Sequence, residues 1–334
     1  MPLIIDREQV LDLYAEAAEK KWVLPTFNAE NLTTSEAILQ AVSEYGDYIG
    51  INNLPIIIGI TNLYTERPQA VYYTQTRKWE IGLRLFLEEL NILLSDESPF
   101  RHLRVMVHLD HILHDEDSKL LKWDMHQFSS IMYDASTLPF AQNIEKTADF
   151  VEQHSKIIFI EGACDEIGTA NTISEDENSM VEQAEKYYRD TGVDLIVANL
   201  GTEHRSSESK LSYNSGLAKK ISERIGPRLC LHGTSSVAPD KLSSLFEQGI
   251  RKVNVWTVLE RAATEVLFQE MLKNADKLVG TKLVNDLINK EILGKSVSPD
   301  SASSVDYFTT TYRQDIVYQS MKNTVTGFLR KWYQ

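Results

Sequence analysis

The chain of 334 residues contains 48 Asp and Glu against 34 Lys and Arg, which gives a formal net charge of −14. This charge argues against DNA or RNA as a partner, because phosphate backbones are bound by clustered Lys and Arg. It does not exclude a small anionic substrate in one local pocket. With only two cysteines, Cys164 and Cys230, the chain is typical of a reducing compartment rather than of a secreted protein.

The first residues do not resemble a signal peptide, because the acidic Asp6 stands there and no long apolar run follows a basic start. The longest apolar runs, such as 55–60 and 103–109, have the length of strands. They fall far short of the ~20 apolar residues that span a bilayer. We therefore expect a cytoplasmic chain without a membrane partner.

Short apolar segments alternate with helical patterns along most of the chain. The predicted strands are 23–27, 55–60, 103–109, 128–133, 157–160, 194–198, 228–231 and 251–255. The predicted helices are 33–46, 79–94, a short one near 116–122, 140–154, 178–191, 238–248 and 257–275. Near-continuous apolar strands are typical of a parallel sheet covered by helices, so we predict an α/β fold, a (β/α)8 TIM barrel.

An open, doubly wound sheet is the alternative fold. It predicts a glycine-rich turn after the first strand, and the sequence PTFNAENL at 25–32 contains no glycine.

Two segments stand outside the repeat. Residues 62–79 are rich in tyrosine and longer than a usual connection between a strand and a helix. The tail begins as a polar linker near 296 and ends in a helical pattern. We predict a barrel domain over 1–295, followed over 296–334 by a linker and a C-terminal helix that docks on the barrel or on a neighbouring subunit.

Histidines follow three predicted strands, at the end of a barrel where active sites lie. They are His111, His204 and His232. A single histidine is more often structural, but three that converge can hold a divalent metal with one position open for substrate. Asp110 has three interpretations: a helix cap, a partner that orients a histidine, or a general acid and base beside a metal-bound substrate.

Two further strand ends suit an anion. The turn Gly233-Thr234-Ser235 and the strand end from Asn254 to Thr257 offer backbone N–H groups and hydroxyls at the starts of helices. Each signal is weak alone, and together they favour a phosphate site.

Taken in order, several stretches resemble the class II, metal-dependent ketose-bisphosphate aldolases, and the tagatose-bisphosphate branch more than the fructose-bisphosphate branch. The matching stretches are VLPTFNAENL (23–32), VHLDH (107–111), SSIMYDASTLPFAQNI (129–144), TGVDLIVANLGTEH (191–204), LHGTSSV (231–237) and VNVWTVL (253–259). No single stretch is specific, but their order and spacing are. The family fold is a (β/α)8 barrel.

The resemblance implies a role for each matching residue. His111, His204 and His232 would bind one catalytic divalent metal, usually Zn²⁺, and Asp110 would exchange a proton with the aldehyde oxygen. The metal would stabilise an enediolate during reversible aldol cleavage of a phosphorylated ketose. The residues assigned to substrate binding are Asn28, Thr61, Arg205, Gly233, Ser235, Asn254 and Thr257.

The sequence departs from the family pattern at several positions. Ala163 replaces a glutamate that binds an auxiliary metal, so we expect that second site to be lost. Arg205 replaces a glycine near the phosphate, and Trp256 replaces a smaller or acidic residue. These changes favour a substrate other than fructose or tagatose bisphosphate. Glu175 is the best candidate for the base that forms the enediolate, with Asp176 and Glu177 as competitors.

Two other functions stay open. The chain could be a sugar-phosphate-binding protein without turnover, although retention of Asp110 with three histidines argues against this. It could also catalyse a related reaction through a metal-bound enolate, such as epimerisation. The family resemblance further implies a homodimer or a homotetramer.

Overall fold

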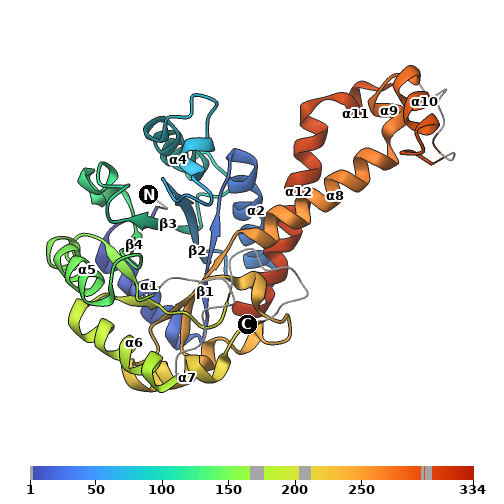
Figure 1. Ribbon diagram of the computed structural model, residues 1–334. Coiled ribbons are helices and arrows are strands. Elements are labelled where there is room, and N and C mark those ends of the chain that lie inside the picture. Colours follow the sequence, from blue (N-terminus) through green and yellow to red (C-terminus); the bar gives the residue numbers. More distant parts are fainter. Residues whose placement is uncertain (1–2, 166–176, 203–211, 295–296, 298–302) are drawn as a thin grey trace.

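The computed structural model describes residues 3–165, 177–202, 212–294, 297 and 303–334. Its centre is a closed barrel of parallel strands in which each strand pairs with the next and β8 pairs with β1 (Figure 1). The strands are β1 (Leu24–Asn28), β2 (Pro55–Thr61), β3 (Arg104–Leu113), β4 (Ser130–Asp134), β5 (Phe159–Ala163), β6 (Leu195–Val197), β7 (Leu229–Leu231) and β8 (Ile250–Val255). The predicted (β/α)8 barrel is confirmed, and the open sheet is excluded.

Helices surround the barrel and cover the outer faces of its strands (Figure 1). Five match the sequence prediction: α2 (Leu32–Ile49), α4 (Trp79–Leu93), α5 (Phe140–His154), α6 (Glu177–Thr191) and α8 (Thr257–Lys273). Three were not predicted: α1 (Arg7–Glu19), α3 (Gln69–Tyr72) and α7 (Ser215–Ile225). The short helix expected near 116–122 is a single 3₁₀ turn, Leu120–Lys122.

The helix predicted over 238–248 is wrong. Two 3₁₀ turns, Leu242–Ser244 and Phe246–Gln248, stand in its place. The indole N–H of Trp332 donates to the carbonyl of Leu242 at 2.9 Å. In an α-helix that carbonyl would accept from the N–H of Phe246, so packing of a distant segment replaces the expected helical hydrogen bond.

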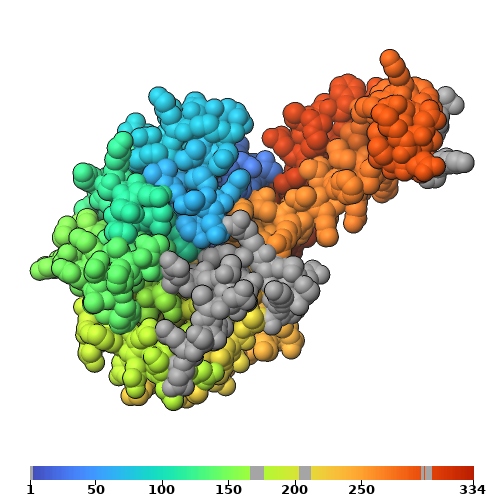
Figure 2. Space-filling model, in the orientation of Figure 1, coloured from blue at the N-terminus to red at the C-terminus, as the bar shows by residue number. Residues whose placement is uncertain are grey.

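A helical arm projects from the barrel (Figures 1 and 2). Helix α8 runs outward, the short helices α9 (Ala275–Leu278), α10 (Thr281–Asn289) and α11 (Val305–Phe308) form the tip, and α12 (Thr310–Trp332) returns beside α8. The boundary predicted between residues 295 and 296 lies outside the described residues. The predicted C-terminal helix is confirmed, and it begins at Thr310.

The end of α12 packs into the barrel wall. The Phe328 ring lies 6.2 Å from the Phe27 ring of β1, measured between centroids. Trp332 and Tyr333 are buried in the main core, and the Tyr45 hydroxyl donates to the Tyr333 carbonyl at 2.7 Å. The C-terminal helix therefore docks on the barrel of its own chain.

Among the described helices, none combines the length and the apolar character that a bilayer span requires.

Candidate active site

The carboxyl ends of the strands enclose one pocket that gathers most of the predicted site residues. Those that line it are Asn28, Thr61, Asp110, His111, His232, Gly233, Ser235, Asn254 and Thr257. Residues so distant in sequence meet here because parallel strands end at the same rim of a barrel. Glu175, His204 and Arg205 lie outside the described residues.

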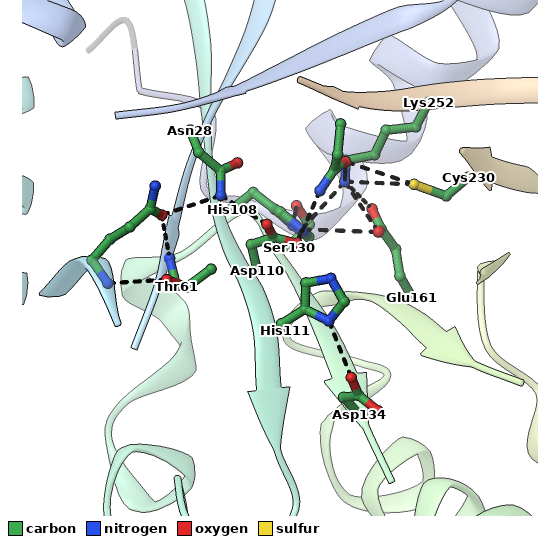
Figure 3. Close-up of polar contacts among 12 residues, drawn as sticks. Asn28, Thr61, His108, Asp110, His111, Ser130, Asp134, Glu161, Cys230 and Lys252 are labelled. Atoms are coloured by element: carbon green, nitrogen blue, oxygen red, sulfur yellow. Dashed lines mark hydrogen bonds and ion pairs between the residues drawn. The ribbon is translucent and has the colours of Figure 1, made fainter. Parts of the chain in front are cut away.

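His111 owes its position to an irregular strand end. The pairing of β3 with β4 shifts register between Leu109 and Ile112, and His111 has a φ of +48°, a value that non-glycine residues seldom adopt. Its Nδ1 lies 3.1 Å from Oδ2 of Asp134 (Figure 3). A carboxylate at Nδ1 keeps the hydrogen on that atom, which leaves the Nε2 lone pair suited to a metal.

The described residues fit a divalent metal. Asp110, His111 and His232 are buried, and each offers one ligand atom, all within 4.8 Å of one another. The imidazole rings of His111 and His232 meet edge to face with centroids 4.9 Å apart. Two nitrogen donors beside a carboxylate oxygen suit zinc and similar metals.

Nearby charges shift the pKa of His111. Burial lowers this pKa, but the carboxylates of Asp110 and Asp134 outweigh burial and raise it above its ordinary value. Protons and a metal would therefore compete for this ring in acidic solution.

Asp110 lies inside β3 and therefore caps no helix. Its Oδ2 accepts from Nδ2 of Asn28 at 2.7 Å, and its Oδ1 accepts from Nδ2 of Asn254 at 2.9 Å (Figure 3). Burial raises the pKa of Asp110, but His111 and the other neighbouring histidines outweigh it and hold the pKa well below its ordinary value. The pocket thus contains a buried carboxylate that stays ionised at neutral pH.

Two backbone features give the pocket an anion-binding wall. Gly233 has a φ of +65°, a left-handed conformation, and it begins a 3₁₀ turn over Thr234–Ser236. The Thr234 hydroxyl donates to the carbonyl of Asn254 at 2.6 Å and so joins this turn to β8. Helix α8 begins at Thr257 on the same pocket wall. Unpaired N–H groups at a helix start favour a phosphate.

The segment after β2 supplies pocket residues that the sequence analysis missed: Tyr64, Glu66, Arg67 and Gln69. The Tyr64 ring stacks on the His111 ring at a centroid distance of 4.4 Å. The Gln69 side-chain oxygen accepts from the Thr61 N–H at 2.8 Å and from Asn28 Nδ2 at 3.2 Å. The unusual length and tyrosine content of 62–79 were the available signal.

A second group that sequence analysis missed lies beneath the pocket. Lys252 of β8 is fully buried, with its Nζ 2.8 Å from Oε1 of Glu161. The available signal was a lysine two positions before Asn254 in an otherwise buried strand, so that both side chains point into the barrel.

Glu177, one of the competitors for the role of base, begins α6. Its carboxylate accepts from Nζ of Lys220 at 2.6 Å and from Nδ2 of Asn214 at 3.0 Å. It is therefore engaged with α7 and does not line the pocket described above.

Comparison with known proteins identifies the family. The family described as fructose-bisphosphate aldolase class-II matches residues 8–311. The chain belongs to this family. Its members are aldolases, so this class II aldolase is a lyase, and the resemblance to the class II aldolases noted in the sequence is confirmed.

Individual relatives agree with this assignment. The fructose-bisphosphate aldolase of Staphylococcus epidermidis is 28% identical over 284 residues, which cover 82% of this chain and 87% of the relative. A solved fructose-bisphosphate aldolase from Campylobacter jejuni has a TM-score of 0.75 at 16% identity, and the match covers 99% of this chain and 94% of that one. The YdjI aldolase from Escherichia coli K12 has a TM-score of 0.61 at 17% identity, and the match covers 96% of this chain and 95% of that one. At such low identity the solved structures support the fold alone.

Proposed function

We propose that this aldolase cleaves a phosphorylated ketose reversibly, with one catalytic divalent metal, Zn²⁺, bound by His111, His204 and His232. The observation that supports it best is the Asp110 carboxylate, buried beside His111 and His232 in a pocket with an anion-binding wall. When bound, the metal supplies Lewis acidity that stabilises the enediolate at the substrate carbonyl.

The protein side chains carry out the proton transfers and bind the substrate. Asp110, fixed by Asn28 and Asn254, exchanges a proton with the aldehyde oxygen. The Gly233–Ser235 turn and Thr257 bind the substrate phosphate, and Thr61 lines the same pocket. Glu175 removes the proton next to the ketone, and Arg205 contributes a cation to substrate binding.

The substrate we propose is a phosphorylated ketose other than fructose or tagatose bisphosphate. Trp256 lines the pocket next to the anion-binding wall, and Tyr64 and Arg67 line it from the segment after β2, so three bulky side chains bound the space for the substrate. Ala163 has no ligand atom to offer, so we also propose that the auxiliary metal site is lost. The cytoplasmic location stays a prediction.

Metal analysis combined with Asp110→Ala tests this function. We expect about one zinc per chain in the wild type and in Asp110→Ala, and none in His204→Ala. Asp110→Ala should lower kcat by at least 10²-fold, the scale of a lost general acid and base. The readout is release of a triose phosphate from a panel of ketose phosphates.

Three outcomes would contradict the proposal in different ways. Wild-type protein that takes up no zinc even after reconstitution would exclude the metal mechanism. Tight sugar-phosphate binding without turnover would favour a binding protein. Conversion of the ketose to an epimer, without a triose product, would favour epimerisation.

We also propose that the chain forms a homodimer or a homotetramer through its arm. Large apolar side chains are exposed along α8 and at the arm tip: Phe268, Leu272, Leu283, Ile292 and Phe308. Monomeric proteins seldom expose such a cluster.

A further inference from the structure

Fully buried polar side chains form a layer directly beneath the pocket. The layer consists of His108 on β3, Glu161 on β5, Cys230 on β7 and Lys252 on β8, each with no exposed surface (Figure 3). Apolar side chains usually fill the interior of such barrels. A buried ion pair is weak evidence for stability, because desolvation of the two charges offsets their attraction. Stability alone therefore does not explain why this barrel buries two charged side chains beneath its pocket.

The ammonium group of Lys252 has a defined set of acceptors. Its Nζ lies 2.8 Å from Oε1 of Glu161, 3.2 Å from Nε2 of His108 and 2.7 Å from Oδ1 of Asn254. An ammonium has three N–H donors and no acceptor. The ammonium also lies 3.0 Å from Oε2 of Glu161 and 3.8 Å from Sγ of Cys230, so Glu161 and Asn254 are its closest acceptors.

The charge of Lys252 is stable in this environment. Burial lowers its pKa, but the carboxylates of Glu161 and Asp110 outweigh burial and raise the pKa above its ordinary value. Burial also raises the pKa of the Cys230 thiol, so Glu161 is the anion that balances the ammonium.

The contact with Lys252 also determines which ring nitrogen of His108 accepts a hydrogen bond. Because Lys252 can only donate, Nε2 of His108 accepts, and its Nδ1 then donates to the Ser130 hydroxyl at 2.9 Å. The same Nε2 lies 3.7 Å from Oδ1 of Asp110, so the His108 ring lies between the ammonium and the catalytic carboxylate.

Asn254 lies between Lys252 and Asp110, and its amide has two chemically different ends. The oxygen accepts from Lys252, and the nitrogen donates to Oδ1 of Asp110 at 2.9 Å. A flipped amide would place its N–H₂ against the ammonium and its oxygen against the carboxylate, two repulsive contacts. The ammonium and the carboxylate therefore favour the same amide orientation, and Lys252 holds the oxygen end of the amide whose nitrogen donates to Asp110.

We propose that Lys252 is a positioning residue that acts on Asp110 through the amide of Asn254. This inference rests on the proposed function, because it assigns Asp110 a role in turnover. The ammonium touches no group that lines the open pocket except Asn254. Glu161 and His108 hold the ammonium of Lys252 in place. The ammonium donates to the Asn254 oxygen, and the Asn254 nitrogen donates to Asp110.

A double-mutant cycle tests this chain of contacts. Lys252→Met is combined with Glu161→Gln so that no unpaired charge stays buried. We expect kcat to fall about 10- to 100-fold, the scale of a misplaced catalytic group, with KM and zinc content nearly unchanged. In an Asn254→Ala background the same pair of changes should cause no further loss of kcat.

A matched control removes another ion pair far from the pocket. Arg7 and Asp194 form two hydrogen bonds of 2.8 and 2.7 Å between α1 and the start of β6. Arg7→Met with Asp194→Asn should lower the unfolding temperature without changing kcat. Equal loss of kcat in both backgrounds of the Asn254 cycle would assign Lys252 a general structural role and overturn the proposal.

Neutron diffraction provides a readout that does not depend on turnover. In deuterated wild-type crystals, the Asn254 nitrogen should donate to Asp110 at 2.9 Å, and in the Lys252→Met, Glu161→Gln variant this hydrogen bond should lengthen or be lost. An unchanged hydrogen bond between Asn254 and Asp110 in the variant would overturn the inference whatever the reaction is. The expected hydrogen bond in a wild type without aldol cleavage would instead contradict only the proposed function.

Discussion

Glu260 is a carboxyl group with an unusual environment near the start of α8. It lies in the first turn of α8, half-buried, and its Oε1 has no hydrogen-bond partner among the described residues. Burial and the nearby Glu30 raise its pKa from 4.5 to about 7, although Arg67 opposes this rise. Below pH 7 the group is therefore neutral in the folded protein.

This raised pKa predicts that Glu260→Gln stabilises the protein in alkaline solution. In the unfolded chain Glu260 ionises near pH 4.5, and in the folded chain only near pH 7. The unfolded state therefore binds fewer protons in this window, and the free energy of unfolding falls as pH rises. Urea unfolding at pH 8 should show the variant about 1–3 kcal/mol more stable than the wild type, with little difference at pH 4.

The control for this prediction is Glu265→Gln, at an exposed position of the same helix. It should change stability little at either pH. A Glu260→Gln effect that is equal at both pH values would contradict the raised pKa.

The pocket residues at strand ends could be predicted from the sequence. The buried residues beneath the pocket, which position them, could not. Asp110, His111, His232 and Asn254 directly follow or end apolar strands, so the barrel topology places them together. Lys252 lies inside a strand, and its partner Glu161 is 91 positions away. Their contact depends on strand register, which apolar periodicity does not reveal.

At the scale of elements, the segment between β2 and α4 depends on Asp117. This buried carboxylate accepts from Asn62 Nδ2 at 2.7 Å, from the Leu63 N–H at 3.2 Å and from the Leu113 N–H at 2.8 Å. It therefore ties the start of the segment to the end of β3. Through this tie Tyr64 is held above His111.

We predict that Asp117→Ala loosens this segment. Loss of the carboxylate leaves backbone N–H groups without their acceptor, at a cost of about 2–4 kcal/mol in the free energy of unfolding. Limited proteolysis should show faster cleavage between residues 63 and 68, and KM for the ketose should rise. Glu116→Ala, at the exposed neighbouring position, serves as control, and equal cleavage rates in both variants would argue against the tie.

Helices and strands could be predicted where the apolar pattern of the local sequence agrees with the tertiary packing. All eight strands of the barrel were predicted, because apolar residues dominate most of these short runs, although β8 (Ile250–Val255) also contains Arg251, Lys252 and Asn254. Helix α7 was missed although Leu217, Ala218, Ile221 and Ile225 line its buried face, since charged residues interrupt this short run. The segment 238–248 has a helical pattern, but Trp332, far away in sequence, determines its conformation.

At the scale of the whole molecule, the arm should determine assembly. Phe268 is 63% exposed and Ile292 is 61% exposed, and burial of such side chains between subunits would stabilise an oligomer. We predict that Phe268→Asp shifts the mass in solution toward the monomer, measured by sedimentation equilibrium. The unfolding temperature of the monomer should stay close to that of the wild-type chain at high dilution.

Lys273→Asp is a suitable control, because it also changes charge at an exposed position of α8. It should leave the mass unchanged. A wild type that is monomeric at all concentrations would contradict the assembly that we propose. The sequence predicted the C-terminal helix but not the arm, since the outward course of α8 depends on contacts with α12 rather than on local pattern.

The return of α12 to β1 has a consequence for how the chain folds. The Tyr333 hydroxyl donates to the carbonyl of Pro55, a residue 278 positions earlier, and Phe328 covers Phe27. During synthesis, the first strand is complete long before the helix that shields its outer face has left the ribosome. Contacts of such long range slow folding, and the uncovered wall of a nascent chain is an apolar surface that chaperones bind. We therefore expect this barrel to close only after translation has passed residue 333.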